Sequence, residues 1–141
     1  MVISKEAYHK MVDSIKSIPP EEGGILGSVS GVIKFIELDK GVNSPKACSY
    51  SPDVSHLNSI ISKWEKANIS FQGIFHSHFF GIDTLSKGNI RYIETIMKSM
   101  PKTIDNLLFP IVVMPEKKLV VYCAYKIDGS IKIKRDRLII C

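Results

Sequence analysis

Apolar side chains recur along the chain at two different spacings, and these spacings predict the order of its helices and strands. Between residues 3 and 17 an apolar side chain returns every three or four positions, which is typical of an amphipathic helix, and Pro19 and Pro20 would end it. The same spacing predicts two more helices, at 53–67 and 86–100. Runs rich in β-branched residues predict strands at 24–31, 32–38, 69–75, 107–114, 118–126 and 130–140.

Turn and loop residues separate these elements. The segment 41–46 is predicted to be a loop, and Asp128-Gly129 the turn between the last two strands. Ser51-Pro52-Asp53 is predicted to start the second helix, with Pro52 at or near its first turn. The resulting order, αββαβαβββ, predicts a single α/β domain over 1–141, an αβ sandwich in which helices flank a mixed β-sheet.

The composition is that of a chain that folds around a packed core. Of the 141 residues, 45% are hydrophobic and 23% are charged, which excludes a disordered tail, a collagen-like chain and a coiled coil. No apolar run approaches the ~20 residues that cross a bilayer. The beginning of the chain carries charges where a signal peptide would need an apolar segment. We therefore expect a cytoplasmic protein with no membrane partner.

The net charge of +5 is concentrated in the second half of the chain. Residues 71–141 contain eleven basic and six acidic residues, whereas residues 1–70 contain eight of each. A basic surface suits an acidic partner, either a nucleic acid or an acidic protein. Because aromatic residues are not interleaved with the basic ones, we favour a solvated basic face and expect no nucleic-acid partner. A steep loss of nucleic-acid affinity with salt would support the other interpretation.

Histidines rather than cysteines indicate a metal site. Cys48, Cys123 and Cys141 are widely spaced and odd in number, so we expect free thiols and no cysteine zinc site. His76 and His78 stand two apart at the end of a predicted strand, where the period of two turns both imidazoles to the same face. Two neutral imidazoles on one face suit a zinc ion, and a pair of structural or surface histidines is the alternative interpretation.

Polar residues before and after the histidines favour the metal interpretation. Ser86 follows eight residues after His78, Asn89 follows three residues later, and an acidic pair, Glu21-Glu22, stands directly before Gly23-Gly24-Ile25-Leu26. Each of these also has an ordinary structural interpretation. Ser86 is expected to cap the helix that Asn89 helps to start, and the acidic pair fits a solvated turn after two prolines.

Other residues that draw notice have structural interpretations that we favour. His9 and His56 lie in predicted helices, and we expect them at the surface. Trp64 falls on the apolar face of its helix, and we expect it in the core. Phe79 and Phe80, next to the histidines, are expected to pack in the core, with an apolar wall that faces a substrate as the alternative.

At these residues the sequence resembles the JAB/MPN family. The JAMM metalloprotease motif of that family is a glutamate before a strand, then His-x-His, seven residues, Ser, two residues and Asp. This chain has Glu21 before a strand, then His76-Ser-His78, seven residues, Ser86, two residues and Asn89. The resemblance implies a cytidine-deaminase-like αβ sandwich. It also implies hydrolysis of peptide or isopeptide bonds, with substrates cut after the C-terminal tail of ubiquitin or a ubiquitin-like protein.

The resemblance further implies a role for each of these residues. His76 and His78 would be zinc ligands, the position of Asn89 would supply the third, and a water would complete the open arrangement of a catalytic zinc. Zinc would lower the pKa of that water toward ~7. Glu21 would be the general base, close to the metal and not bound to it, and Ser86 would donate its hydroxyl to the oxyanion.

Asn89 departs from the family pattern, which has aspartate at this position. A neutral amide oxygen would bind Zn²⁺ more weakly than a carboxylate. Asp83, in the loop that precedes the third helix, is an alternative source of the ligand, and Glu22 is an alternative to Glu21. Two hypotheses of different classes follow. The first is a zinc metallopeptidase that acts on a protein or peptide; the second is a catalytically impaired JAB/MPN domain that binds a protein partner.

Overall fold

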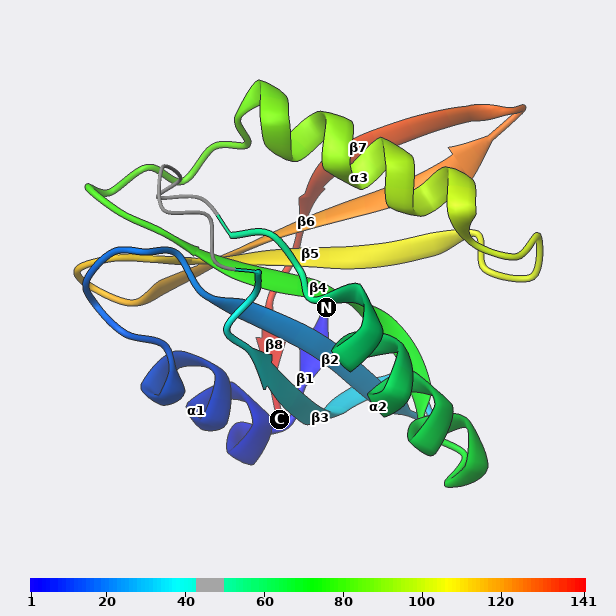
Figure 1. The fold of residues 1–141 in the computed structure, drawn as a ribbon, viewed down its shortest axis with the longest axis horizontal. Helices are drawn as coiled ribbons and strands as arrows, with labels where there is room; N and C mark the ends of the chain where they lie inside the picture. Colours follow the sequence, from blue (N-terminus) through cyan, green and yellow to red (C-terminus); the bar gives the residue numbers. More distant parts are fainter. Residues whose placement is uncertain (43–49) are drawn as a thin grey trace.

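A computed structural model, which describes residues 1–42 and 50–141, contains an eight-stranded mixed sheet in the order β7-β6-β5-β4-β2-β3-β1-β8 (Figure 1). Its strands are β1 (Val2–Ile3), β2 (Gly23–Val29), β3 (Val32–Asp39), β4 (Ser70–His78), β5 (Asn106–Val113), β6 (Lys118–Ile127), β7 (Ser130–Asp136) and β8 (Ile139–Ile140). The helices are α1 (Lys5–Ser14), α2 (Val54–Lys66) and α3 (Lys87–Ser99). Residues 43–46 of the predicted loop, and Cys48, lie outside the described residues.

Two hydrophobic layers lie on opposite faces of the sheet. The alternation of β4 sends Phe75 to one face and Ile74 to the other. Met11 of α1 belongs to the layer of Phe75, whereas Trp64 of α2 and Met97 of α3 belong to the layer of Ile74. All of these side chains are buried. Helices on both faces of a mixed sheet confirm the predicted α/β sandwich (Figure 1).

The two shortest strands were not predicted from the sequence. β1 pairs in parallel with β3 and with β8, in the register Ile3↔Ile33 and Val2↔Ile139. The prediction of one strand over 130–140 is therefore wrong, because β7 ends at Asp136 and β8 lies at the opposite edge of the sheet. Two residues are too few to produce a periodic pattern, so only their tertiary pairing identifies them as strands.

The beginnings of α1 and α2 are set by capping side chains rather than by apolar spacing. Ser4 caps α1, so the predicted start at residue 3 is wrong, and Ile3 belongs to β1 instead. Asp53 caps α2 by accepting a hydrogen bond from the His56 N–H at 3.2 Å, so Pro52 lies directly before the cap, near the first turn as predicted. No helix in the described part of the chain is long and apolar enough to cross a membrane.

Candidate metal centre

The end of β4 brings two imidazoles together. His76 and His78 are 4% and 6% exposed, and their Nε2 atoms lie 2.9 Å apart. The rings meet edge to face, with their centroids 4.7 Å apart. The period of two therefore turns both side chains to one face, as the sequence predicts. The strand itself extends through both histidines, three residues beyond its predicted end.

Burial and one hydrogen bond determine where the protons of the two histidine rings lie. Burial, with a smaller contribution from His78, lowers the pKa of His76 to about 3, so His76 is a neutral imidazole at pH 7. Nδ1 of His78 lies 3.1 Å from the Ile82 carbonyl oxygen, which can only accept, so this nitrogen carries the proton. The other ring nitrogen of His78, Nε2, faces Nε2 of His76 at 2.9 Å.

Glu21 reaches the histidines because β2 pairs with β4. Gly23 stands opposite His76 in this pairing, and the Ser77 N–H donates to the Glu22 carbonyl at 2.8 Å. A Cβ atom on Gly23 would lie 2.4 Å from the Phe75 carbonyl oxygen, so only glycine fits this close approach. Ligand atoms of Glu21, His76 and His78 all lie within 4.8 Å of one another.

Burial raises the pKa of the Glu21 carboxyl above its ordinary value. The Tyr50 N–H, which donates to the Glu21 carboxylate at 3.2 Å, and the nearby His78 oppose this shift. A raised pKa makes the carboxylate a better proton acceptor near neutral pH, which suits a general base. The Glu22 carboxylate is engaged elsewhere, because it accepts a hydrogen bond from the Lys16 N–H at 3.0 Å. The structure thus brings Glu21, and not Glu22, to the histidines.

Asp83 is directed away from the histidines. Its carboxylate forms an ion pair with Arg135 of β7 at 3.0 Å, and its carbonyl oxygen accepts a hydrogen bond from the Tyr122 hydroxyl at 2.9 Å. Arg135 lowers the pKa of Asp83, so the pair is charged at pH 7. Asp83 therefore anchors the loop before α3 to the sheet. It is not part of the cluster of Glu21, His76 and His78 in this structure.

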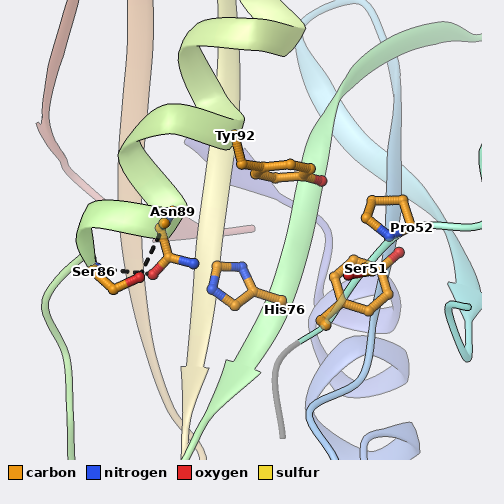
Figure 2. A pocket seen from close by; sticks show the side chains of 8 residues that line it. Ser51, Pro52, His76, Ser86, Asn89 and Tyr92 are labelled. Atoms are coloured by element: carbon orange, nitrogen blue, oxygen red, sulfur yellow. Dashed lines mark hydrogen bonds between the residues drawn. The ribbon is translucent and has the colours of Figure 1, made fainter. Parts of the chain in front are cut away.

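Ser86 and Asn89 form the capping box of α3, which confirms the structural role predicted for Ser86. Oγ of Ser86 accepts from the Asn89 N–H at 3.0 Å, and Oδ1 of Asn89 accepts from the Ser86 N–H at 2.9 Å. Figure 2 shows the side-chain nitrogen of Asn89 on the side of His76. An amide NH₂ group only donates, so coordination of a cation by Asn89 requires its carboxamide to rotate.

Two hollows flank the histidine pair. One has a volume of about 250 Å³, and Tyr50, His76 and Tyr92 are part of its lining. The other has a volume of about 540 Å³ and is mainly apolar; its lining includes Pro19, Glu21, His78, Phe79, Phe80 and Ile82. Ser86 and Asn89 line both hollows. An extended chain that passes from one hollow to the other would therefore cross the cluster.

Solved structures identify the fold. AF2198, a JAB1/MPN domain protein from Archaeoglobus fulgidus, aligns over 99% of this chain and 98% of its own, with a TM-score of 0.58 and 15% sequence identity. The chain has the JAB1/MPN fold. Protein DSY2949 from Desulfitobacterium hafniense also aligns with the chain, with a TM-score of 0.66 and 16% identity over 100% of this chain and 93% of that one. No protein-family model and no curated protein sequence matches the chain.

The residues that the JAB1/MPN fold brings together here fit a metal ion. Two imidazole nitrogens and a carboxylate are donor types that divalent transition metals prefer, and both histidines are buried. The Ile82 carbonyl oxygen accepts from Nδ1 of His78 and so orients the ring, as carbonyl groups commonly do for metal-binding histidines. The cluster therefore offers a ligand set of two histidines, with Glu21 either as the third ligand or as a base beside the ion.

Two tyrosines and one aspartate near the site were missed in the sequence. The Tyr50 hydroxyl donates to the buried Asp39 carboxylate at 2.7 Å, and the Asp53 N–H donates to the same oxygen at 2.9 Å. Asp39 thus ties the end of β3 to the start of α2 and fixes Tyr50 beside Glu21. Tyr92 lies over the smaller hollow (Figure 2). None of these residues belongs to a spaced motif, so the sequence carried no signal for them.

The remaining candidates lie mostly where they were expected. His9 and His56 are exposed, and Trp64 is buried in the core. Phe79 packs in the core beneath α1, whereas Phe80 is 89% exposed, so the core prediction is confirmed for Phe79 and wrong for Phe80. Phe80 adopts a positive φ of 58° at the turn after β4, which directs it outward at the edge of the larger hollow.

Proposed function

We propose that the chain is a zinc-dependent metallopeptidase of the JAMM type that hydrolyses an amide bond in a protein or peptide. The observation that carries the proposal is the convergence of His76, His78 and Glu21 between two open hollows in a JAB1/MPN fold. Zinc, when bound, supplies a Lewis acid that activates water and polarises a carbonyl group at neutral pH. The protein's own residues provide the geometry and the proton transfers.

Each residue of the site has a task that its position allows. His76 and His78 would hold the ion through their imidazole nitrogens, and Asn89 would provide the third ligand if its carboxamide oxygen turned toward the ion. Glu21 takes the proton of the attacking water and returns it to the leaving amine, a step that its raised pKa favours. Ser86 already accepts the Asn89 N–H through its hydroxyl oxygen, so its own hydrogen is free to donate to the substrate carbonyl oxygen.

The proposed substrate is an amide at a flexible tail, and a ubiquitin-like protein is the partner that the family resemblance implies. A tail of this kind can enter the site in an extended conformation, as an added strand. The two hollows on either side of the histidines leave room for such a chain. A cytoplasmic location, and the absence of nucleic-acid and membrane partners, are part of the same proposal.

One observation favours a second function, that of a protein-binding module with an impaired metal site. The Asn89 carboxamide oxygen is held by the Ser86 N–H at 2.9 Å, so rotation toward the ion would break half of the capping box. The neutral amide also lacks the charge of the aspartate found in the JAMM motif. Under this alternative the same surface would bind a protein partner, and zinc would be dispensable.

Zinc content and affinity separate the two functions. We would measure them by elemental analysis and chelator competition on the chain as it stands, on Asn89→Asp and on His76→Ala. One zinc per chain, held at sub-micromolar free metal and lost in His76→Ala, supports the metallopeptidase; hydrolysis of a C-terminal coumarin amide of a ubiquitin-like protein then tests the activity. Zinc in Asn89→Asp alone would reject the peptidase in favour of the binding module.

A further inference from the structure

A cavity that the metal chemistry does not use lies between α2 and α3, over β2 and β4. Its volume is about 570 Å³, within the range of small-ligand pockets. Ile25 and Ile74 form part of its floor, and Leu57, Ile61 and Ile96 part of its helical walls. None of the described residues that line it is charged. The lining therefore favours a neutral aliphatic group and disfavours an ionic one.

This cavity adjoins the candidate metal centre. Tyr92 and Pro52 line it, and both also line the 250 Å³ hollow that contains His76. Figure 2 shows Tyr92 extending from α3 above Asn89 and His76 toward Pro52. A molecule with its amide at the histidines can therefore place an adjoining group past the Tyr92 ring and into the apolar cavity.

The Tyr92 hydroxyl is a donor in need of an acceptor at this junction. It is buried and has no hydrogen-bond partner in the described part of the chain. Burial, together with the charge of Asp39, raises the pKa of Tyr92, so the hydroxyl keeps its proton and remains a donor. A buried donor without a partner is unfavourable, whereas a ligand oxygen placed here would satisfy it.

We propose that the cavity between α2 and α3 is a specificity pocket for an aliphatic group next to the substrate amide, and that a substrate carbonyl oxygen accepts a hydrogen bond from Tyr92 Oη. The identity of this group as part of the substrate rests on the proposed metallopeptidase function. The lining of the pocket is uncharged and mainly apolar, so it suits the aliphatic part of the substrate. Tyr92 fixes the direction in which that part leaves the metal centre.

Methyl NMR on the isoleucine-labelled protein tests the pocket directly, with N-octanoylglycinamide as the probe. The Ile25, Ile61 and Ile96 methyl signals should shift on titration, whereas those of Ile3 and Ile33, which belong to the layer on the opposite face, should not. Titrations with zinc and with a chelator should give the same shifts, because the pocket itself contains no metal ligand.

Three variants sharpen the test. Tyr92→Phe keeps the ring and removes the donor, so the Kd of the probe should rise about fivefold, with Tyr125→Phe as the matched control. Ile96→Trp should fill the pocket and abolish the shifts. Asn58→Trp should also fill the pocket and abolish the shifts. Asn58 lines the pocket from an exposed position of α2, so this second variant keeps the test valid if Ile96→Trp fails to fold.

The outcomes separate this pocket from the proposed function. The absence of shifts, or shifts that neither filling variant removes, would overturn the pocket even if zinc binds and the amide is hydrolysed. Shifts of the same methyl groups with protein concentration alone would also overturn it, because a second copy of the chain would then cover the groove. If the probe binds but zinc does not, the pocket is supported as a site for aliphatic amides and the proposed peptidase function is rejected.

Discussion

Ser86 and Asn89 hold each other in place: the backbone N–H of each donates to the side-chain oxygen of the other, at 2.9 Å and 3.0 Å. This capping box starts α3 and also fixes the Asn89 carboxamide beside His76 (Figure 2). One pair of residues therefore starts a helix and lies beside the candidate metal centre. Substitutions at these two positions need readouts that distinguish stability from metal binding and hydrolysis.

Asn89→Asp should raise zinc affinity by at least about tenfold, because a carboxylate adds a negative charge next to the ion. The aspartate still accepts the Ser86 N–H, so the free energy of unfolding of the metal-free protein should change by less than about 1 kcal/mol. Chelator competition and denaturant unfolding measure the two quantities. Asn106→Asp, at an exposed position at the start of β5, is the control for charge alone.

His76→Gln should abolish the stabilisation of the protein by zinc. Zinc at a hundred times its Kd should add about 2.7 kcal/mol to the free energy of unfolding of the unaltered chain, and a chelator should reverse this effect. Glutamine keeps much of the buried volume and removes the imidazole. His56→Gln, on the exposed face of α2, should retain the full effect of zinc. Equal zinc stabilisation in both variants would contradict the assignment of His76.

Glu21→Gln should leave zinc bound and lower kcat by about 10²- to 10⁴-fold, the usual contribution of a general base. Glu22→Gln is the matched control, and its kcat should stay close to that of the unaltered chain because its carboxylate faces Lys16. Zinc content and hydrolysis are measured on the same preparations. Loss of zinc in Glu21→Gln would mean that the carboxylate is a ligand rather than the base.

Ser86→Asp separates the capping role of Ser86 from its proposed catalytic role. Aspartate caps helices as well as serine does, so stability should be retained, but it has no hydroxyl to donate. We expect kcat to fall by about 10²- to 10³-fold, the usual cost of one lost oxyanion donor. Ser86→Ala should lose kcat to a similar extent and also about 1 kcal/mol of stability. Unchanged kcat in Ser86→Asp would leave Ser86 with capping alone.

The Asp83–Arg135 ion pair should make the loop before α3 sensitive to acid. Arg135 lowers the pKa of Asp83, so the stabilisation that the pair provides is complete above the ordinary aspartate pKa and is lost as the pH falls through the lowered value. Hydrogen exchange of the loop amides measures this opening. Asp83→Asn should give the acid-like exchange at every pH, whereas Asp105→Asn should leave the profile of the loop unchanged.

Residues close in sequence were the ones whose arrangement could be predicted. The facing imidazoles of His76 and His78, the capping by Ser86 and the burial of Trp64 all follow from local periods or local hydrogen bonds. Phe80 was predicted to be buried and is exposed, because a positive φ after β4 turns it outward. The pattern of apolar residues in the sequence contains no information on such a turn.

The sequence by itself determined the order of the helices and the longer strands and the pairing of His76 with His78. These depend on side-chain periods that act within one element. Only the tertiary structure decided that Glu21 lies close to the histidines while Glu22 does not, that Asp83 pairs with Arg135, and that Tyr92 lies between the candidate metal centre and an apolar cavity. Each of those contacts joins segments far apart in sequence, and pairing between distant strands and helices leaves no local period in the chain.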